Sequence, residues 1–485
     1  MVDALIIDAC RTPRGIGKAG KGALAGLHPQ HLGATVLRAL ADRTGINTAD
    51  VDDIIWGCSS QRGPQSGDLG RMSALDAGYD IRASGVTLDR FCGSGITSVN
   101  IAAASIMAGQ EDLVVAGGCE MMSMEGRRGE GPLMMDAGNL HLRALHPQSH
   151  QGVCADAIAT MEGITRADVD ALGLESQKRA AAAIAGGHFK KSLVPVHRDD
   201  GSLALDHEEY PRPQTTAEAL AGLKPAFPAI ADYALDDKGT TYRGLILQRY
   251  PGLEIEFMHH AGNSSGVVDG AAALLLASPA YAKAHGLKPR ARVVAMANMG
   301  DDPTLMLNAP VPATRKVLAK AGLTLDDIDL FEINEAFAVV AEKYIRDLKL
   351  DRAKVNVNGG SIALGHPIGA TGSILIGTLL DELEGATSSA AWSRCARPAA
   401  WRRRSSSSAS EAFVYRLIPV VASAADPRSG RCRSGARNRR PDWPEARRKR
   451  QSQFCDVPAS ISLMLSLLPA GRGGSTFRTS QPRFD

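Results

Sequence analysis

Cys92 is the residue best placed to act as a nucleophile. It lies in the segment DRFCGSG (89–95), between a predicted strand at Ser84–Leu88 and a helix of small residues. A helix N-terminus stabilises an anion such as a thiolate, and the neighbouring glycines let a substrate approach the backbone closely. On this segment alone, a small buried cysteine in a packed turn remains an alternative interpretation.

Comparable turns carry candidate polar groups in the second half of the chain. His366 is the titrating side chain of the glycine-rich stretch GGSIALGHPIGATG (359–372), and a histidine commonly activates a cysteine nucleophile. The stretch has neither a GxxxxGK[ST] nor a GxGxxG pattern, which argues against phosphate binding and leaves a structural loop as the alternative. Asn334 opens NEAF at a predicted strand end, where active-site groups collect, although it could also be a helix N-cap.

Together, several segments in this order resemble the signatures of the thiolase family. They are FCGSG at Cys92, AGNSSGVVDGAA from Ala261, NEAFA at Asn334 and the glycine-rich stretch at His366; the early CRTPRG and QRGPQSGDLGRMSALDAG (61–78) also match. The resemblance covers about residues 1–385. It implies an acyltransferase that cleaves a 3-oxoacyl-CoA with CoA to acetyl-CoA and a shortened acyl-CoA, or that condenses two acetyl-CoA. Coenzyme A is then a substrate, and neither a cofactor nor a metal is expected.

The resemblance also implies residue roles. Cys92 would attack the 3-keto carbon and keep the acyl group on sulfur, His366 would ionise the thiol and help hold the thioester oxygen, and Asn334 would hold a water in the same oxyanion hole. The main-chain N–H of Cys92 would contribute to a second hole. Ser265 resembles a residue that contacts the pantetheine arm of CoA. The remaining residues assigned to the substrate site are Phe337, His150 and Gln151, where Gln151 stands in a place at which many members have Met.

Alternating strands and helices predict mostly parallel sheets covered by helices. The first half has expected strands at Leu5–Ala9, Val51–Gly57, Ser84–Leu88 and Asp112–Gly117, with a helix at His31–Thr44. The apolar stretch after the turn at Asn263–Gly266 is expected to be a helix. The second half repeats the order, with strands at Ala291–Asn298 and Ile328–Ile333 and helices at Pro312–Ala321, Glu335–Leu348 and Gly369–Leu383.

The fold class expected from this order and from the resemblance is α/β, with two duplicated βαβαβ halves, each a five-stranded mixed sheet with helices. The predicted parts are 1–275 as the N-terminal half, 286–385 as a truncated C-terminal half and 386–485 as a tail. Within the first part, an insertion at about 124–250 should lie over the site and contain a helix near Arg166–Ile184.

Composition limits the function classes. The eight cysteines are spread singly with no CxxC pair, so neither a disulfide framework nor a zinc site is indicated, and a reducing, cytoplasmic location is expected. Cys10, Cys58, Cys119 and Cys154 are expected core residues. The start MVDALIIDACRTP does not have the pattern of a signal peptide, and no stretch is expected to reach the roughly 18 apolar residues of a membrane span.

The tail has a different composition from the rest of the chain. From Ala386 onward there are 18 Arg, 1 Lys and 6 acidic residues, a net charge of +13, whereas residues 1–385 carry −10. Read one base out of frame, residues 391–408 permit GLVTMCAAGGMAPAIIIE, which resembles a thiolase ending. That ending is a strand, a Cys followed by a glycine run, and a second strand, and its Cys would protonate the enolate. Cys395 is not that cysteine.

The tail is therefore interpreted as a frameshifted, disordered segment, and the second half is expected to lack its last two strands. An arginine-rich nucleic-acid- or membrane-binding extension is the alternative, but the tail has no interleaved aromatics and no amphipathic period. No nucleic-acid or membrane partner is thus expected. A homodimer or homotetramer is expected, because residues 61–78 resemble a family interface.

Two other functions remain open on the sequence. One is a catalytically impaired or dead CoA-binding protein of the thiolase fold, the product of a damaged gene. The other is a decarboxylating ketoacyl synthase, a class that sets two His, or His and Asn, beside its Cys; the GHPIGATG and NEAF motifs speak against it.

Overall fold

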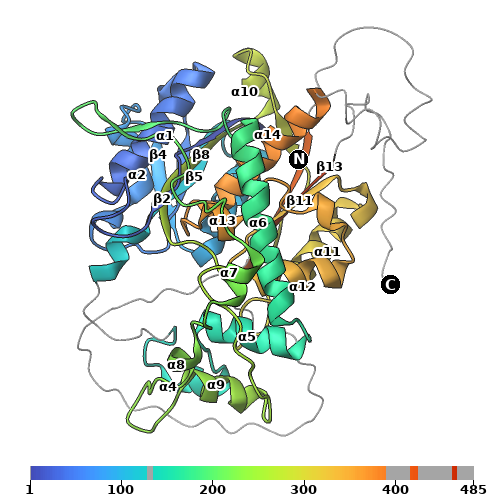
Figure 1. The fold of residues 1–485 in the computed structure, drawn as a ribbon. Helices are drawn as coiled ribbons and strands as arrows, with labels where there is room; N and C mark the ends of the chain where they lie inside the picture. The colour runs from blue at the N-terminus through green and yellow to red at the C-terminus, as the bar shows by residue number, and fades with distance from the viewer. Residues whose placement is uncertain (1, 128–134, 389–414, 424–460, 467–485) are drawn as a thin grey trace, which may run out of the picture.

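The first half of the chain forms five neighbouring strands of one large sheet (Figure 1). The computed structural model describes residues 2–127, 135–388, 415–423 and 461–466. The strand order is β4-β3-β5-β8-β1, with β8 antiparallel to both neighbours and β3 parallel to β4 and β5. The bounds are β1 Ala4–Arg11, β3 Asp53–Gly57, β4 Ser84–Leu88, β5 Leu113–Met121 and β8 Val268–Ala277. The four strands predicted here from the sequence are confirmed.

Strand β8 corrects one expectation, because the apolar stretch after the turn at Asn263–Gly266 was predicted to be a helix and forms this strand instead. All ten residues of this strand are buried, and both of its edges are hydrogen-bonded, to β1 and β5. A short apolar run has the same pattern in a buried helix and in a central strand. Its position between two strands is what makes this run a strand. The short strand β2, Gly15–Ile16, pairs with its first residues.

The second half continues the same sheet, since β1 and β9 pair antiparallel. Its strand order is β9-β12-β13-β11, and Val355 makes a parallel bridge to Phe331 of β11. The predicted strand at Ala291–Asn298 is divided into β9 and β10. The bounds are β9 Ala291–Val293, β10 Ala297–Gly300, β11 Leu330–Ile333, β12 Tyr415–Ser423 and β13 Ile461–Ser466.

Strands β12 and β13 come from the tail and occupy the place of the last two strands of the second half, which were predicted to be missing. They fill the space between β9 and β11, whose facing edges would otherwise leave backbone groups unpaired. Their sequences, YRLIPVVAS and ISLMLS, are rich in good strand formers. Residues 386–388 of the predicted tail belong to the end of α14, and the remaining tail residues, for which disorder was predicted, lie outside the described residues.

The order of these two strands breaks the internal repeat. In the first half the fourth strand, β5, is parallel to β3, and the fifth, β8, is antiparallel to β1. In the second half the later strand, β13, pairs antiparallel with β11, and the earlier one, β12, pairs parallel with β9. In the first half the later strand, β8, lies beside β1, whereas in the second half the earlier strand, β12, lies beside β9. The two tail strands have therefore exchanged places relative to the first half.

Helices α3 and α14 lie between the two halves. They pack against each other, and their apolar residues share one core cluster with residues from strands of both halves, including Ile6, Val114 and Leu330. On the other face of the first half, α1 and α2 pack against alternate residues such as Trp56. The bounds are α1 Pro29–Thr44, α2 Leu69–Asp76, α3 Ser94–Ala108, α10 Pro279–Ala284, α11 Pro310–Ala321, α12 Ala338–Leu348, α13 Ser361–Leu364 and α14 Thr371–Ser388.

One segment of the described chain, Phe91–Ala108, is long and apolar enough to cross a membrane by length and composition, contrary to the sequence-based expectation. It contains α3, and 67% of it is buried inside the protein. An apolar helix enclosed by two halves of a sheet needs no membrane to cover it.

The insertion contains more helices than the sequence predicted. The expected helix is confirmed as α6, Arg166–Gly186, with a capping box at Thr165 and Asp168. In Figure 1, α4, α5, α8 and α9 form a group beyond the lower end of α6. The bounds are α4 Leu140–Leu145, α5 Gln151–Met161, α7 Ala217–Ala221, α8 Pro228–Ala231 and α9 Tyr242–Arg249, with the hairpin β6 Val196–His197 and β7 Leu203–Leu205.

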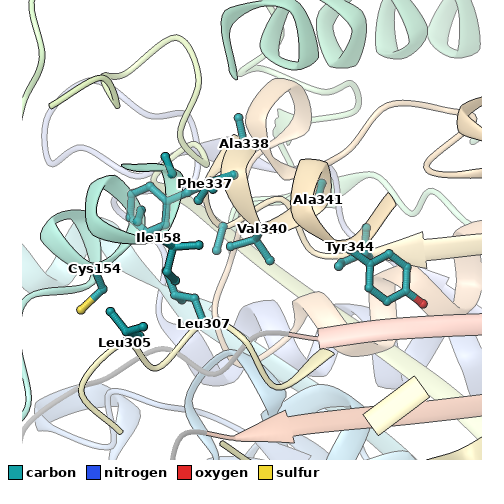
Figure 2. Close-up of a cluster of buried hydrophobic side chains, with 14 of the residues drawn as sticks. Cys154, Ile158, Leu305, Leu307, Phe337, Ala338, Val340, Ala341 and Tyr344 are labelled. Atoms are coloured by element: carbon teal, nitrogen blue, oxygen red, sulfur yellow. The ribbon is translucent and has the colours of Figure 1, made fainter. Parts of the chain in front are cut away.

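A buried apolar cluster holds this group against the second half (Figure 2). Cys154 and Ile158 of α5 meet Leu305, Leu307 and Phe337 there, together with residues from the start of α12. Phe337 immediately follows the NEA segment of Asn334. The insertion is therefore fixed directly beside a strand end that carries a candidate site residue.

Candidate active site

The turn that carries Cys92 is held by its own side chains. Asp89 accepts a hydrogen bond from the N–H of Phe91 (2.7 Å), and the Ser94 hydroxyl accepts from the N–H of Arg90 (2.8 Å). Phe91 adopts a φ of 50°, which is unusual for a non-glycine residue. The following 3₁₀ turn, Phe91–Gly93, runs into α3. This places the thiol of Cys92 at the start of a helix, fully buried.

The second motif loop touches this turn through glycines. A Cβ added to Gly95 would lie 2.9 Å from the N of Ser373 and 3.0 Å from the O of Gly369, and one added to Gly372 would lie 2.2 Å from the N of Ile96. Any larger side chain would push the two backbones apart. The glycines therefore allow the loop of His366 to reach the start of α3.

His366 faces Cys92 with a free lone pair. Its Nε2 lies 2.9 Å from the Sγ of Cys92, and its Nδ1 lies 2.6 Å from the hydroxyl of Thr371. That hydroxyl donates to the carbonyl of Pro367 (2.9 Å), so it accepts from Nδ1–H. We assign the proton to Nδ1 on this network, and Nε2 is then the acceptor for the thiol.

Burial keeps this imidazole neutral. His366 is 5% exposed, and burial lowers its pKa from 6.5 to about 3. A neutral histidine with its acceptor nitrogen against a thiol can take the thiol proton as a general base.

Asn334 joins the same point from the end of β11. Its Nδ2 lies 3.3 Å from Nε2 of His366, and its Oδ1 accepts a hydrogen bond from the Ser361 hydroxyl (2.6 Å). The Ser361 contact fixes the amide with its N–H groups toward the histidine. Once His366 has taken a proton, both side chains offer donors to one small volume beside the sulfur, the arrangement that an oxyanion needs.

Ser265 and Phe337 lie on adjoining backbone. The N–H of Ser265 donates to the carbonyl of Ala336 (3.0 Å), and Ser264 forms a β-bridge with Phe337. The next residue, Gly266, accepts from the N–H of His366 (2.9 Å). The turn at 263–266 thus connects the Asn334 segment with the His366 loop, and it brings both predicted residues to the site.

His150 is connected to Phe337 through a chain of aromatic side chains, and Gln151 follows it at the start of α5. His150 caps α5 by accepting from the N–H of Gly152 (3.1 Å), and burial lowers its pKa to about 4. Its ring centroid lies 5.6 Å from that of Phe227, which lies 5.8 Å from that of Phe337. Gln151 is the first residue of α5 and is half-buried.

The sequence analysis assigned no role to Thr371, Ser361 or Phe227, which contact the predicted site residues in the structure. Thr371 and Ser361 stand inside the glycine-rich stretch, five residues from His366 on either side, so their hydroxyls were visible candidates for orienting the ring. Phe227 lies far from every motif, and only its ring contacts reveal it.

The other described cysteines lie elsewhere. Three of them donate to main-chain carbonyls and Cys58 lies against Glu120, all buried in the core as predicted. Burial raises the pKa of Cys10 to about 12. Within the described part of the chain, no group of three or more His, Cys, Asp or Glu could hold a metal ion.

Two family profiles match the chain. A profile for the thiolase N-terminal domain matches residues 4–231, and one for the thiolase C-terminal domain matches residues 287–399. Together they cover more than half of the chain.

Individual proteins are similar over most of their own length. The chain is 41% identical over 393 residues to the steroid 3-ketoacyl-CoA thiolase FadA6 of Mycobacterium tuberculosis, covering 79% of this chain and 88% of the relative. It is 39% identical over 404 residues to a beta-ketoadipyl-CoA thiolase of Acinetobacter baylyi (79% and 94%). The crystal structure of Bacillus anthracis acetyl-CoA acetyltransferase superposes with a TM-score of 0.69 at 29% identity, covering 96% and 99% of the two chains.

Proposed function

Because this chain belongs to the thiolase family of acyltransferases, we propose that it transfers acyl groups between CoA thioesters through a thioester on Cys92. The reaction is thiolysis of a 3-oxoacyl-CoA to acetyl-CoA and a shortened acyl-CoA, or the condensation of two acetyl-CoA. The observation that carries this proposal is the 2.9 Å contact between the Cys92 thiol and the unprotonated nitrogen of His366.

The first half-reaction follows from this geometry. His366 Nε2 takes the thiol proton, and the sulfur attacks the 3-keto carbon. Negative charge moves onto the carbonyl oxygen, which the Asn334 amide and the new Nε2–H can stabilise. Collapse of this adduct breaks the bond between C2 and C3, leaves the acyl group on sulfur, and releases acetyl-CoA as its enolate, which needs a proton. CoA, having lost its thiol proton, then takes the acyl group as a thiolate. Cys92 leaves as a thiolate and recovers its proton from His366, so the proton lost by CoA balances the one gained by the enolate.

Whether the chain has a donor for that proton distinguishes an active thiolase from the alternative, a catalytically impaired protein of the thiolase fold. In the thiolase ending, a second cysteine would supply it, and no described cysteine other than Cys92 lies at the site. The exchanged order of β12 and β13 supports the alternative that this chain is catalytically impaired. The matches to both thiolase domains favour either of these functions over a ketoacyl synthase.

Adduct mapping tests the proposal. Incubation with acetoacetyl-CoA, followed by peptide mass spectrometry, should show an acetyl group on Cys92. The variant Cys92→Ala should show none, and His366→Ala should acylate slowly. An adduct on another cysteine, with Cys92 free, would contradict the assignment. Unchanged turnover after dialysis against a chelator would support a reaction without a metal.

We also propose a homodimer that pairs through β4. This strand ends the sheet order, and its Val86 is 44% exposed; an unprotected edge strand is a template for pairing. The nearby Ile81 is 80% exposed, and α2 of the predicted interface segment packs beside β4. Light scattering should show a dimer that Val86→Lys disrupts and that Val267→Lys, at a similarly exposed site, does not. A monomeric parent protein would contradict this interface.

A reducing, cytoplasmic location is proposed on the cysteines. All five cysteines that the structure describes are free thiols, which suits a compartment where disulfides do not persist. Fractionation of cells that produce the protein would test this.

A further inference from the structure

Glu120 is a buried carboxylate at the end of β5 that the proposed chemistry does not use. It is 0% exposed. Its Oε2 accepts hydrogen bonds from the N–H groups of Ser59 (2.9 Å) and Gly369 (2.9 Å). Its Oε1 accepts from the N–H of Ser60 (3.0 Å) and, at 3.4 Å, from the Gln65 side chain. The Cys58 thiol also lies 3.9 Å from Oε1, so at least five donors surround the two oxygens, which matches the acceptor-only character of a carboxylate.

These donors come from two separate parts of the chain. Ser59, Ser60 and Gln65 belong to the turn after β3, and Gln65 is itself fixed because it accepts from the N–H of Met121 (2.6 Å). Gly369 belongs to the loop of His366. Glu120 therefore binds the turn at 59–65 and the histidine loop through one side chain.

The Gly369 contact lies in the middle of the segment that orients His366. The loop is held at its start, where the N–H of His366 donates to Gly266, and Thr371 holds the ring two residues after Gly369. Gly369 fits tightly, since an added Cβ would lie 2.6 Å from the O of Gly57 and 2.8 Å from the O of Cys119. A shift of Gly369 would therefore move Thr371 and the imidazole together.

We propose that Glu120 is a positioning residue, which sets the orientation of His366 toward Cys92 by tying Gly369 to the turn at 59–65. The proposal rests on the proposed function only in taking His366 as the base for Cys92. Alkylation of Cys92 by iodoacetamide tests it without any acyl-CoA. If Cys92 is never acylated but its alkylation depends on Glu120, the proposed activity fails and the positioning role stands.

The first comparison is Glu120→Gln in the full chain. Glutamine keeps the shape but turns an NH₂ group toward backbone donors, so alkylation of Cys92 near neutral pH should slow about 2- to 10-fold, the range for one lost hydrogen bond. Glu209→Gln is the matched control. Glu209 also accepts from backbone N–H groups, those of Ile16 and Ala23, and none of its donors in the described chain belongs to the His366 loop. Its variant should alkylate at the parent rate.

A double-mutant cycle separates positioning from general loosening. In a His366→Ala background, Glu120→Gln should cause no further slowing, because the group through which it acts is gone. An unchanged rate in the single variant, or the same loss with and without His366, would overturn the proposal. If Glu120→Gln does not fold, Gln65→Ala is measured in the same cycle: slowing that depends on His366 supports the proposal, and an unchanged rate overturns it.

Discussion

Replacing Thr371 by Val tests whether His366 is held in the tautomer that accepts a proton from Cys92. Thr371 is buried, and its hydroxyl takes the hydrogen bond from Nδ1 at 2.6 Å while donating to Pro367. Valine has nearly the same shape but no hydroxyl, so the variant removes the acceptor and leaves the packing.

The imidazole then has two unfavourable states. With the proton on Nδ1, it buries an unsatisfied donor at a cost of about 1–3 kcal/mol. With the proton on Nε2, it opposes the Cys92 thiol and the Asn334 amide, which are both donors, and it can no longer act as a base. A shift of that size lowers the population of the active tautomer about 5- to 150-fold. Alkylation of Cys92 near neutral pH should slow within that range.

The assay is iodoacetamide uptake at Cys92, followed by peptide mass spectrometry across neutral and mildly alkaline pH. Thr371→Ser, which keeps the hydroxyl, is the matched control and should react close to the parent rate. Nitrogen chemical shifts of ¹⁵N-labelled histidine would report the tautomer directly. If Thr371→Val alkylates as fast as the parent protein, this hydrogen bond does not set the tautomer and the reasoning is refuted.

Two further predictions concern histidines. His366→Ala should slow alkylation of Cys92 by at least about tenfold, the lower part of what a positioned base contributes, and an unchanged pH profile would make His366 structural. Burial lowers the pKa of His150 to about 4, so between pH 6.5 and about 4 the unfolded chain binds a proton that the folded protein does not. The free energy of unfolding should therefore fall with decreasing pH by up to about 1.4 kcal/mol per unit from this residue. Urea titrations should show a shallower fall for His150→Asn, which keeps a capping side chain, and no change for His207→Asn, a 72% exposed control; equal slopes in all three proteins would contradict this.

The sequence predicted the elements whose patterns are local. Strands β1, β3 and β5 are apolar runs bounded by turns, and α6 has a capping box and a C-terminal glycine in the left-handed region, so each was recognisable from its own residues. Strand β8 was not, because a run such as GAAALLLA is equally apolar in a helix, and its neighbours β1 and β5 are more than a hundred residues away.

The same distinction holds for the site. Cys92, His366 and Asn334 were predicted because each stands in a turn with its own glycine or strand-end signal, and the structure places Nε2 of His366 2.9 Å from the Cys92 sulfur and 3.3 Å from the Asn334 amide nitrogen. His150 was assigned to the site from resemblance, but its contact runs through Phe227 and Phe337. Contacts between rings from three distant segments cannot be predicted from the residue spacing within any one segment.

The last prediction concerns the ending of the chain. By the repeat, the fourth strand of the second half should run parallel to β11 and the fifth antiparallel to β9, whereas β13 is antiparallel to β11 and β12 is parallel to β9. A one-base repair that restores GLVTMCAAGGMAPAIIIE would supply two strands joined by a Cys and a glycine run. It would return a general acid, which contributes about 10²–10⁴ in rate, and an oxyanion donor, which contributes about 10²–10³. The repaired protein should therefore thiolyse acetoacetyl-CoA at least about 10⁴-fold faster than the 485-residue chain, the product of the lower limits. Alkylation of Cys92, which needs His366 and the residues that orient it but not the ending, should differ far less between the two, and this contrast separates a lost acid from a misfolded site. Comparable thiolysis by both proteins would show that the exchanged strands still complete the active site and that the ending is not a defect.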